Sequence, residues 1–222
     1  MMAPRGGMES VVSALIRELG PDLKLSSQVT SLPETPNLVL AVPPGELARL
    51  IRDQDPASAR ALEGVRSSPL ITITVFARRA DFKKGPPRGV GVLIPRNEGM
   101  RLLGVLFNSS SFPERVSDPE AVSLTVMLGG TTDPEALRLE DSEILELLHQ
   151  ELGALLGFQG SLLHAEITRW NSAIPVYSRD LEKARQALTS GFCNTPGRVV
   201  FTNYSGEVSI RGLIDSLAGL SN

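Results

Sequence analysis

The pattern of apolar and polar residues predicts helices near both ends of the chain and strands between them. Apolar residues near the start recur at helical spacing: Met8, Val11, Val12, Leu15, Ile16 and Leu19. The segment "LKLSSQVT", residues 23–30, alternates apolar and polar positions and predicts a half-buried strand. By contrast "NLVLAV", residues 37–42, is apolar throughout and predicts a central parallel strand, followed by helices over 44–52 and 56–64.

Residues 70–130 have a different pattern, with short apolar runs separated by Gly, Pro, Asn and Ser. These runs predict a largely antiparallel sheet. A helix should follow over 141–156, with Asp141 as its N-cap and Gly157 as its end. The apolar stripe of this helix indicates that it packs against the sheet.

The last third of the chain alternates between strands and helices. We predict a strand in "HAEITRW", a loop through "AIPVY", a helix over 178–189, a strand in "RVVFT" and a closing helix from Ile210. The charges of "RDLEKAR" indicate a solvated helix face with an ion pair between Glu182 and Arg185. Overall, the order of elements predicts an α+β or α/β fold in two parts. Residues 1–43 and 190–222 would form a partial α/β lobe, and residues 44–189 a mixed antiparallel sheet with helices.

The composition narrows the classes of function. The chain has 222 residues, 41% hydrophobic and 21% charged, with a net charge of −3, so a basic surface for nucleic acid is not expected. No apolar run approaches the roughly 20 residues that span a bilayer, and we expect a cytoplasmic protein without a membrane span. With one Cys, Cys193, and two distant histidines, no metal site is expected.

One stretch has the pattern of a phosphate-binding turn. "FTNYSGEVSIRGLIDSL", residues 201–217, predicts the end of a buried strand, a loop containing glycine, and an amphipathic helix. The N-terminus of such a helix presents N–H groups and a partial positive charge to an anion. The same pattern also fits a plain turn between a strand and a helix.

Several blocks occur in the order typical of a known family: "RGGMESVVSALIRELG", "NLVLAVPPGELARLI", "GVLFNSSSFPERV", "SLTVMLGG", "ITRWNSAIPVY" and "FTNYSGEVSIRGLIDSL". Together they resemble protoporphyrinogen oxidases, within the flavin-containing amine oxidase superfamily, over residues 5–220. The resemblance implies FAD as cofactor, with the partial α/β lobe as part of an FAD-binding lobe and residues 44–189 as a substrate-binding domain. The GxGxxG turn that binds the FAD pyrophosphate in this family does not occur here. We therefore expect a chain that carries only the C-terminal half of the family's fold.

The resemblance assigns cofactor contacts to five residues: Val29, Thr202, Val208, Ser209 and Ile210. Two positions depart from the family pattern, because Glu207 stands where Gly is normal and Gly212 where Asp is usual. A carboxylate at 207 would repel a pyrophosphate.

By resemblance the substrate would lie between apolar side chains at Val90, Leu93 and Met127, and Trp170 would lie near the flavin. An ordinary sheet core requires the same residue types. No catalytic side chain is expected, because hydride transfer to a flavin needs no acid or base from the protein.

Three functions remain open at this point. In the first, the chain is the substrate-side half of an FAD-dependent oxidoreductase that works with a separate FAD-binding partner chain. In the second, it is a cofactor-free module for an apolar ring ligand or a partner protein. In the third, it is an inactive remnant. In the first case we expect an exposed apolar surface, covered by the partner chain or by self-association.

Overall fold

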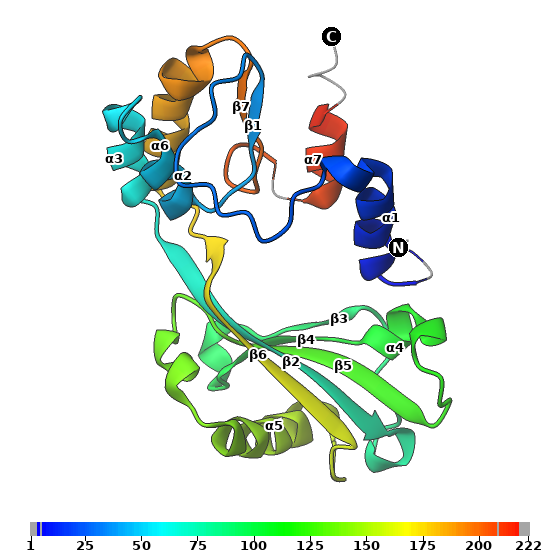
Figure 1. The fold of residues 1–222 in the computed structure, drawn as a ribbon. Coiled ribbons are helices and arrows are strands. Elements are labelled where there is room, and N and C mark those ends of the chain that lie inside the picture. The colour runs from blue at the N-terminus through cyan, green and yellow to red at the C-terminus, as the bar shows by residue number, and fades with distance from the viewer. Residues whose placement is uncertain (1–3, 5, 208, 218–222) are drawn as a thin grey trace.

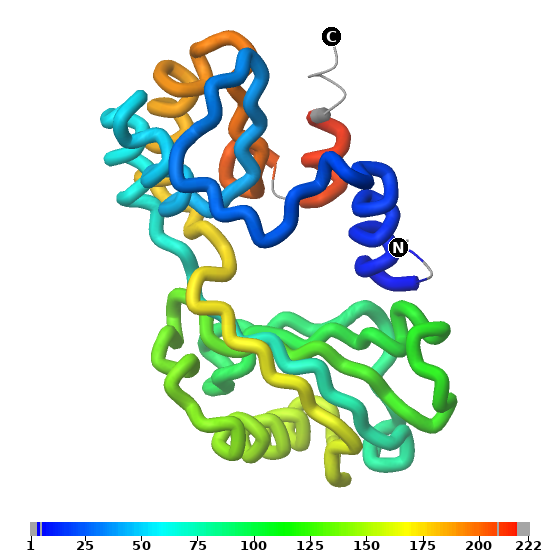
Figure 2. Tube along the Cα trace, viewed as in Figure 1, coloured from blue at the N-terminus to red at the C-terminus, as the bar shows by residue number. Residues whose placement is uncertain are grey.

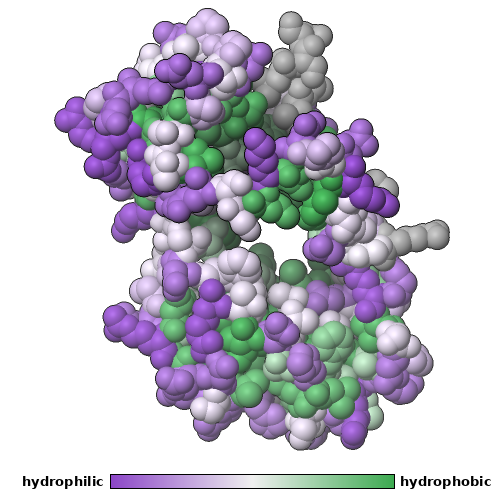
Figure 3. All heavy atoms as spheres, viewed as in Figure 1, coloured by the Kyte–Doolittle hydropathy of each residue, from purple (hydrophilic) through white to green (hydrophobic). Residues whose placement is uncertain are grey.

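The structure is a computed structural model and describes residues 4, 6–207 and 209–217. The chain forms two lobes joined by β2 and β6 (Figure 1, Figure 2). We name them the helical lobe, which contains β1, β7 and helices α2, α3 and α6, and the sheet lobe, which contains the five-stranded sheet and helix α5. Between them the space-filling view shows an opening, with hydrophobic residues at its upper edge (Figure 3).

The helical lobe is built on two short parallel strands. β1 (Leu38–Leu40) pairs with β7 (Arg198–Val200), as the sequence predicted for its two buried strands. Helices α2 (Pro44–Ile51), α3 (Pro56–Glu63) and α6 (Arg179–Ser190) pack with these strands around one core. Its fully buried side chains include Leu47, Ile51, Leu62, Phe192 and Tyr204.

Asp55 connects distant parts of this lobe. Its carboxylate caps α3 by accepting the Ser58 N–H at 3.0 Å, and it also accepts the Phe192 N–H at 2.7 Å. Desolvation on burial acts to raise the pKa of Asp55, but the hydrogen bonds from Ser58 and Phe192 outweigh it and leave the pKa below its usual value. Gly191 is required beside it, because a Cβ there would collide with the Asp55 carboxylate.

The sheet lobe is an antiparallel sheet of five strands in the order β3-β4-β5-β2-β6. The strands are β2 (Ser67–Arg78), β3 (Gly91–Leu93), β4 (Leu102–Leu106), β5 (Ala121–Gly129) and β6 (His164–Pro175). Alternate residues of β2, such as Ile71, Ile73 and Val75, are fully buried in a core shared with α5. Helix α5 (Asp141–Leu156) thus covers one face, and the opposite face is turned toward the opening (Figure 1).

The ends of α5 are set by local hydrogen bonds. Glu140 and Glu143 form a reciprocal capping box, so the predicted N-cap, Asp141, is wrong by one residue. Gly157 ends the helix in a left-handed conformation with φ 71°, as its position predicted. Short helical segments occupy the remaining connections: α4 (Asn108–Ser111), η1 (Gly20–Asp22), η2 (Arg79–Asp81), η3 (Arg96–Glu98), η4 (Pro113–Arg115), η5 (Pro134–Arg138) and η6 (Phe192–Asn194).

Two amphipathic helices are left without a cover on their apolar sides. None of the residues of α1 (Glu9–Leu19) is buried, and Leu15 is 58% exposed. Helix α7 (Ile210–Leu217) exposes Ile210 and Ile214. Both helices lie beside the helical lobe (Figure 1).

The mixed α and β fold class predicted from sequence is confirmed, including the antiparallel sheet. The strand predicted over 23–30 is wrong, because this segment has no strand to pair with among the described residues. Its Val29 and Thr30 carbonyls instead accept hydrogen bonds from the side chain of Arg49, at 2.9 and 3.3 Å. The strand predicted to end at Trp170 continues through Pro175 as β6. Helices α2, α3 and α6, which we expected beside the sheet, share their core with β1 and β7.

Candidate functional site

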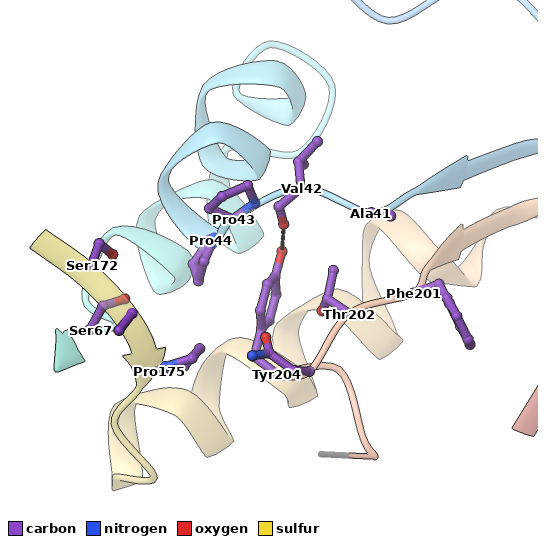
Figure 4. A pocket seen from close by; sticks show the side chains of 12 residues that line it. Ala41, Val42, Pro43, Pro44, Ser67, Ser172, Pro175, Phe201, Thr202 and Tyr204 are labelled. Atoms are coloured by element: carbon purple, nitrogen blue, oxygen red, sulfur yellow. Dashed lines mark hydrogen bonds between the residues drawn. The ribbon is translucent and has the colours of Figure 1, made fainter. Parts of the chain in front are cut away.

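A cleft of about 310 Å³ lies at the carboxyl ends of β1 and β7, where the helical lobe meets the sheet lobe (Figure 4). Its lining comes from residues 41–44 and 201–204 of the helical lobe and from Ser67, Ser172, Ala173 and Pro175 of the sheet lobe. Ligands of open parallel sheets bind outside the carboxyl ends of the strands. The position of the cleft therefore makes it the candidate site.

Tyr204 joins the two sides of the helical lobe at the base of this cleft. Its ring is 1% exposed, and its hydroxyl donates to the Val42 carbonyl at 2.7 Å (Figure 4). Burial raises the pKa of Tyr204 to about 12, although the nearby Thr202 hydroxyl acts in the opposite direction. The neutral phenol thus fixes the end of β1 against the loop after β7.

Thr202 presents a polar atom whose hydrogen bonding is incomplete. Its hydroxyl oxygen is buried, and in the described part of the chain it makes no hydrogen bond of acceptable geometry. The Thr202 backbone is held by Ser205, whose hydroxyl accepts the Thr202 N–H and donates to the Thr202 carbonyl, both at 3.0 Å. A buried polar atom of this kind in a cleft wall is suited to a polar ligand.

The predicted cofactor residues are only partly brought together. Thr202 lines the cleft. Ser209 caps α7, since its hydroxyl accepts the Gly212 N–H at 3.0 Å, and Ile210 begins that helix with its side chain exposed. Val29 is exposed on the irregular segment before β1, and Val208 lies outside the described residues.

Glu207 and Gly212, the two positions that depart from the family pattern, lie next to each other in the structure. The Glu207 carboxylate lies against Gly212, in the space that a side chain at position 212 would fill. A carboxylate is therefore already present beside the first turn of α7.

The predicted substrate residues lie in the sheet lobe. Leu93 pairs with Gly104, which pairs with Met127, so Leu93 and Met127 share the open sheet face, roughly 10 Å apart as two strand spacings require. Leu93 is 79% exposed, and its Cδ2 would lie 3.2 Å from a Cβ at position 104, so glycine there lets this leucine lean across the sheet. Val90 precedes β3 and is exposed. The apolar floor thus belongs to Leu93 and Met127, with Val90 at its border.

Trp170 lies on the same sheet face as Met127. Thr72 is opposite Met127 on β5 and opposite Thr168 on β6, and Trp170 is two residues from Thr168 along β6, so its side chain points to the same face. It is 49% exposed, and its indole N–H donates to the Thr72 hydroxyl at 3.1 Å. The alternative of a core anchor is therefore wrong, and the indole stands at the surface facing the opening.

Sequence reasoning missed three residues that shape the site: Tyr204, Tyr177 and Arg185. Tyr177 donates to the Asn203 carbonyl at 2.9 Å, and Arg185 donates to the Tyr204 carbonyl at 2.7 Å. The predicted pair between Glu182 and Arg185 is wrong, since Glu182 accepts from Gln186 instead. A signal was available, because Arg185 falls on the buried stripe of α6 formed by Leu181, Ala184 and Leu188.

Other chemistry finds no support in the residues that the structure describes. No group of three or more His, Cys, Asp or Glu among them is placed to hold a metal, and no described helix is long and apolar enough to cross a membrane. Burial raises the pKa of the Cys193 thiol, which disfavours the reactive thiolate.

Comparison with known proteins gives consistent matches. The family model described as flavin containing amine oxidoreductase matches residues 1–202. The mitochondrial protoporphyrinogen oxidase of Nicotiana tabacum is 31% identical over 150 residues, covering 66% of this chain and 29% of its own length. The human protoporphyrinogen oxidase is 27% identical over 201 residues, covering 87% of this chain and 41% of its own.

A solved structure agrees in fold. The crystal structure of a protein assigned as a protoporphyrinogen oxidase from Exiguobacterium sp. 255-15 matches with a TM-score of 0.76 at 15% identity. The match covers 98% of this chain and 51% of that chain. The chain thus spans less than half the length of the two curated relatives.

Proposed function

Because this chain belongs to the family of flavin-containing amine oxidoreductases, we propose that it forms the substrate-side half of an FAD-dependent oxidoreductase of the protoporphyrinogen oxidase type. The observation that carries this proposal is the cleft at the carboxyl ends of β1 and β7, which opens between the two lobes. A ring bound there would lie between the loop of residues 201–204 and the β2 and β6 residues of the sheet lobe.

The residues of the cleft fit one part of FAD. A volume of about 310 Å³ is near the lower end of small-molecule sites, roughly 300–1,000 Å³, and suits a ring system but not a whole dinucleotide. The buried Thr202 hydroxyl would pair with a polar ring edge. When bound, FAD would supply hydride acceptance, while the residues of this chain orient the ring and exclude water.

A complete FAD site needs a further lobe besides the helical lobe and the sheet lobe, because these 222 residues contain no GxGxxG turn for the pyrophosphate. We call it the FAD-binding lobe. Parallel sheets normally have more strands and are covered on both faces, yet among the described residues β1 pairs only with β7, and its Val39 is 60% exposed. Together with the uncovered apolar sides of α1 and α7, this edge would receive an FAD-binding lobe. Self-association through the same surface is the competing arrangement.

The substrate would be an apolar compound that contains a ring or an amine. The open face of the sheet offers a floor of Leu93 and Met127, with Trp170 beside it. No acid or base side chain is assigned there, since the flavin would take the hydride.

The test is an FAD titration of the purified chain, after its absorption spectrum has been recorded for bound flavin. Saturable quenching of flavin fluorescence is the expected result, with weak affinity in the absence of the FAD-binding lobe. Riboflavin is the matched control, because it carries the ring without the pyrophosphate and should bind comparably if the ring cleft dominates. A colourless chain that quenches neither compound would refute flavin binding by this cleft.

One observation favours a second candidate, a cofactor-free module for an apolar ring ligand. Leu93 and Leu106 are both exposed on the open sheet face, each lying over a glycine of the neighbouring strand, Gly104 and Gly91 respectively. This function predicts binding of protoporphyrin in the absence of FAD, with loss of binding on Leu93→Asp. Flavin binding without any porphyrin binding would count against it.

A further inference from the structure

The loop that follows β7 is held in place by two side chains, Tyr177 from the connection between β6 and α6 and Arg185 from within α6. Arg185 donates from Nε to the Tyr204 carbonyl at 2.7 Å and from Nη2 to the Gly206 carbonyl at 3.3 Å. The Tyr177 hydroxyl donates to the Asn203 carbonyl at 2.9 Å. Three carbonyls of one short loop therefore point toward Arg185 and Tyr177.

This arrangement fixes where the loop's donors point. In a trans peptide the N–H points opposite to the carbonyl of the same unit, so the N–H groups of Tyr204, Ser205 and Glu207 are turned away from Arg185 and Tyr177. The Ser205 N–H donates to the Thr202 carbonyl at 3.3 Å. The other two find no acceptor within residues 6–207 and 209–217. Oriented N–H groups without an internal acceptor are suited to a ligand that brings one.

The two clamping side chains act as one unit. The Arg185 guanidinium lies 5.7 Å from the centre of the Tyr177 ring, a distance at which cation and ring attract each other. Arg185 is half-buried and makes no ion pair with a carboxylate of the described residues. The charged guanidinium of Arg185 therefore interacts mainly with the loop carbonyls. Because the guanidinium is planar and bonds two of these carbonyls at once, it fixes the loop better than the ammonium group of a lysine can.

We propose that Arg185 and Tyr177 are positioning residues, which clamp the loop of residues 203–206 so that its N–H groups face an acceptor-bearing edge of the flavin cofactor. Neither side chain lines the cleft, so each acts through the loop. This inference rests on the proposed function, because it names the residues that prepare the same site for its cofactor.

The test compares Arg185→Lys and Tyr177→Phe with a matched control, Arg179→Lys. Arg179 begins the same helix, is exposed and makes no clamp contact with the loop, so its replacement makes the same chemical change. Two quantities are measured on the full chain: hydrogen exchange of the loop amides by mass spectrometry, and the FAD dissociation constant by flavin fluorescence.

Arg185→Lys should raise exchange at the Thr202 and Ser205 amides, the two whose N–H groups are hydrogen-bonded at this loop, and it should weaken FAD binding. Each change should be about 10-fold, as expected when a two-bond fork becomes a point charge and one charged hydrogen bond is lost. Exchange in α5 and the sheet lobe should not change. Tyr177→Phe should have the same effects at smaller size, because one bond is lost. Arg179→Lys should match the wild-type chain in both quantities.

The outcomes separate this inference from the proposed function. If the wild-type chain binds FAD and both clamp variants bind it as tightly, the positioning role is overturned while the proposed function stands. Loop exchange equal to that of Arg179→Lys would overturn the clamp itself. If the wild-type chain ignores FAD, the proposed function fails and the positioning role fails with it.

Discussion

Replacing Tyr204 with Phe removes the buried hydroxyl at the base of the cleft and keeps the ring. The wild-type hydroxyl donates to the Val42 carbonyl at 2.7 Å, and the side chain is 1% exposed, so water cannot substitute for it. A net hydrogen bond contributes about 1 kcal/mol, and an acceptor left unpaired in a buried site costs roughly 1–3 kcal/mol. We therefore expect Tyr204→Phe to lower the free energy of unfolding by about 1–2 kcal/mol.

The same residue gives a pH signature. Burial raises the pKa of Tyr204 to about 12 from an ordinary value of 10.0, so the unfolded chain releases the phenol proton first. The stability that this group contributes is complete below pH 10.0 and is lost as the pH rises toward about 12. The difference corresponds to roughly 3 kcal/mol at most, at about 1.4 kcal/mol for each pH unit. Tyr204→Phe should lack this alkaline loss.

Urea unfolding of both proteins from neutral pH upward measures these quantities, and tyrosinate absorbance provides an independent check. The chain has two tyrosines, so the wild-type titration should contain one late step that is missing from the variant. Equal stability at neutral pH, within about 0.3 kcal/mol, would refute the claim that this bond joins β1 to the loop. An unchanged late titration step in the variant would refute the assignment of the raised pKa to Tyr204.

Three further changes test other parts of the structure. Asp55→Asn should cost about 1–2 kcal/mol, because the charged bond to the Phe192 N–H is weakened. Since the Asp55 pKa is lowered, the difference in unfolding free energy should shrink as the pH falls below the ordinary value of 3.8, and a constant difference would contradict the reasoning. Gly104→Ala should destabilise by roughly 1–3 kcal/mol in thermal unfolding, because its Cβ would lie 2.7 Å from a carbonyl oxygen of β3, whereas Gly45→Ala, with open space and a helical position, should be neutral or stabilising. Leu15→Glu should change stability by less than about 0.5 kcal/mol and reduce self-association in sedimentation, and a loss above about 2 kcal/mol would mean that α1 packs within the chain.

The elements with strong periodicity could be predicted from sequence, because local patterns dominate there. The helix of residues 9–19, the capped helices α3 and α5 and the antiparallel sheet all match their patterns. The segment 23–30 shows the limit of this reasoning. Alternation is necessary for a half-buried strand, but a strand also needs a neighbour, and in this chain Arg49 takes the backbone carbonyls instead.

The site could be predicted only where a single segment forms it. The resemblance assigned a cofactor contact to Thr202, which lies in one contiguous loop after β7, and this residue lines the cleft. Arg185 and Tyr177 reach this loop from another element, so no local pattern connects them with it. The charged face predicted for α6 was wrong at Arg185 for a different reason, because the helical spacing of Leu181, Ala184 and Leu188 in the sequence already places this residue on the buried stripe.

Glu207 and Gly212 show how two departures from a family pattern can form one change. The Glu207 carboxylate occupies the space beside Gly212, where any side chain would collide with it. A negative charge beside the first turn of a helix is stabilised by the partial positive charge of that end. The carboxylate therefore meets the same electrostatic demand that a bound phosphate would meet. On the proposed function, a pyrophosphate can approach α7 only after the exposed Glu207 side chain rotates away, and like charges oppose this approach. The ring cleft, rather than the N-terminus of α7, should then provide most of the affinity of this chain for FAD. The principal phosphate contacts should come from the FAD-binding lobe.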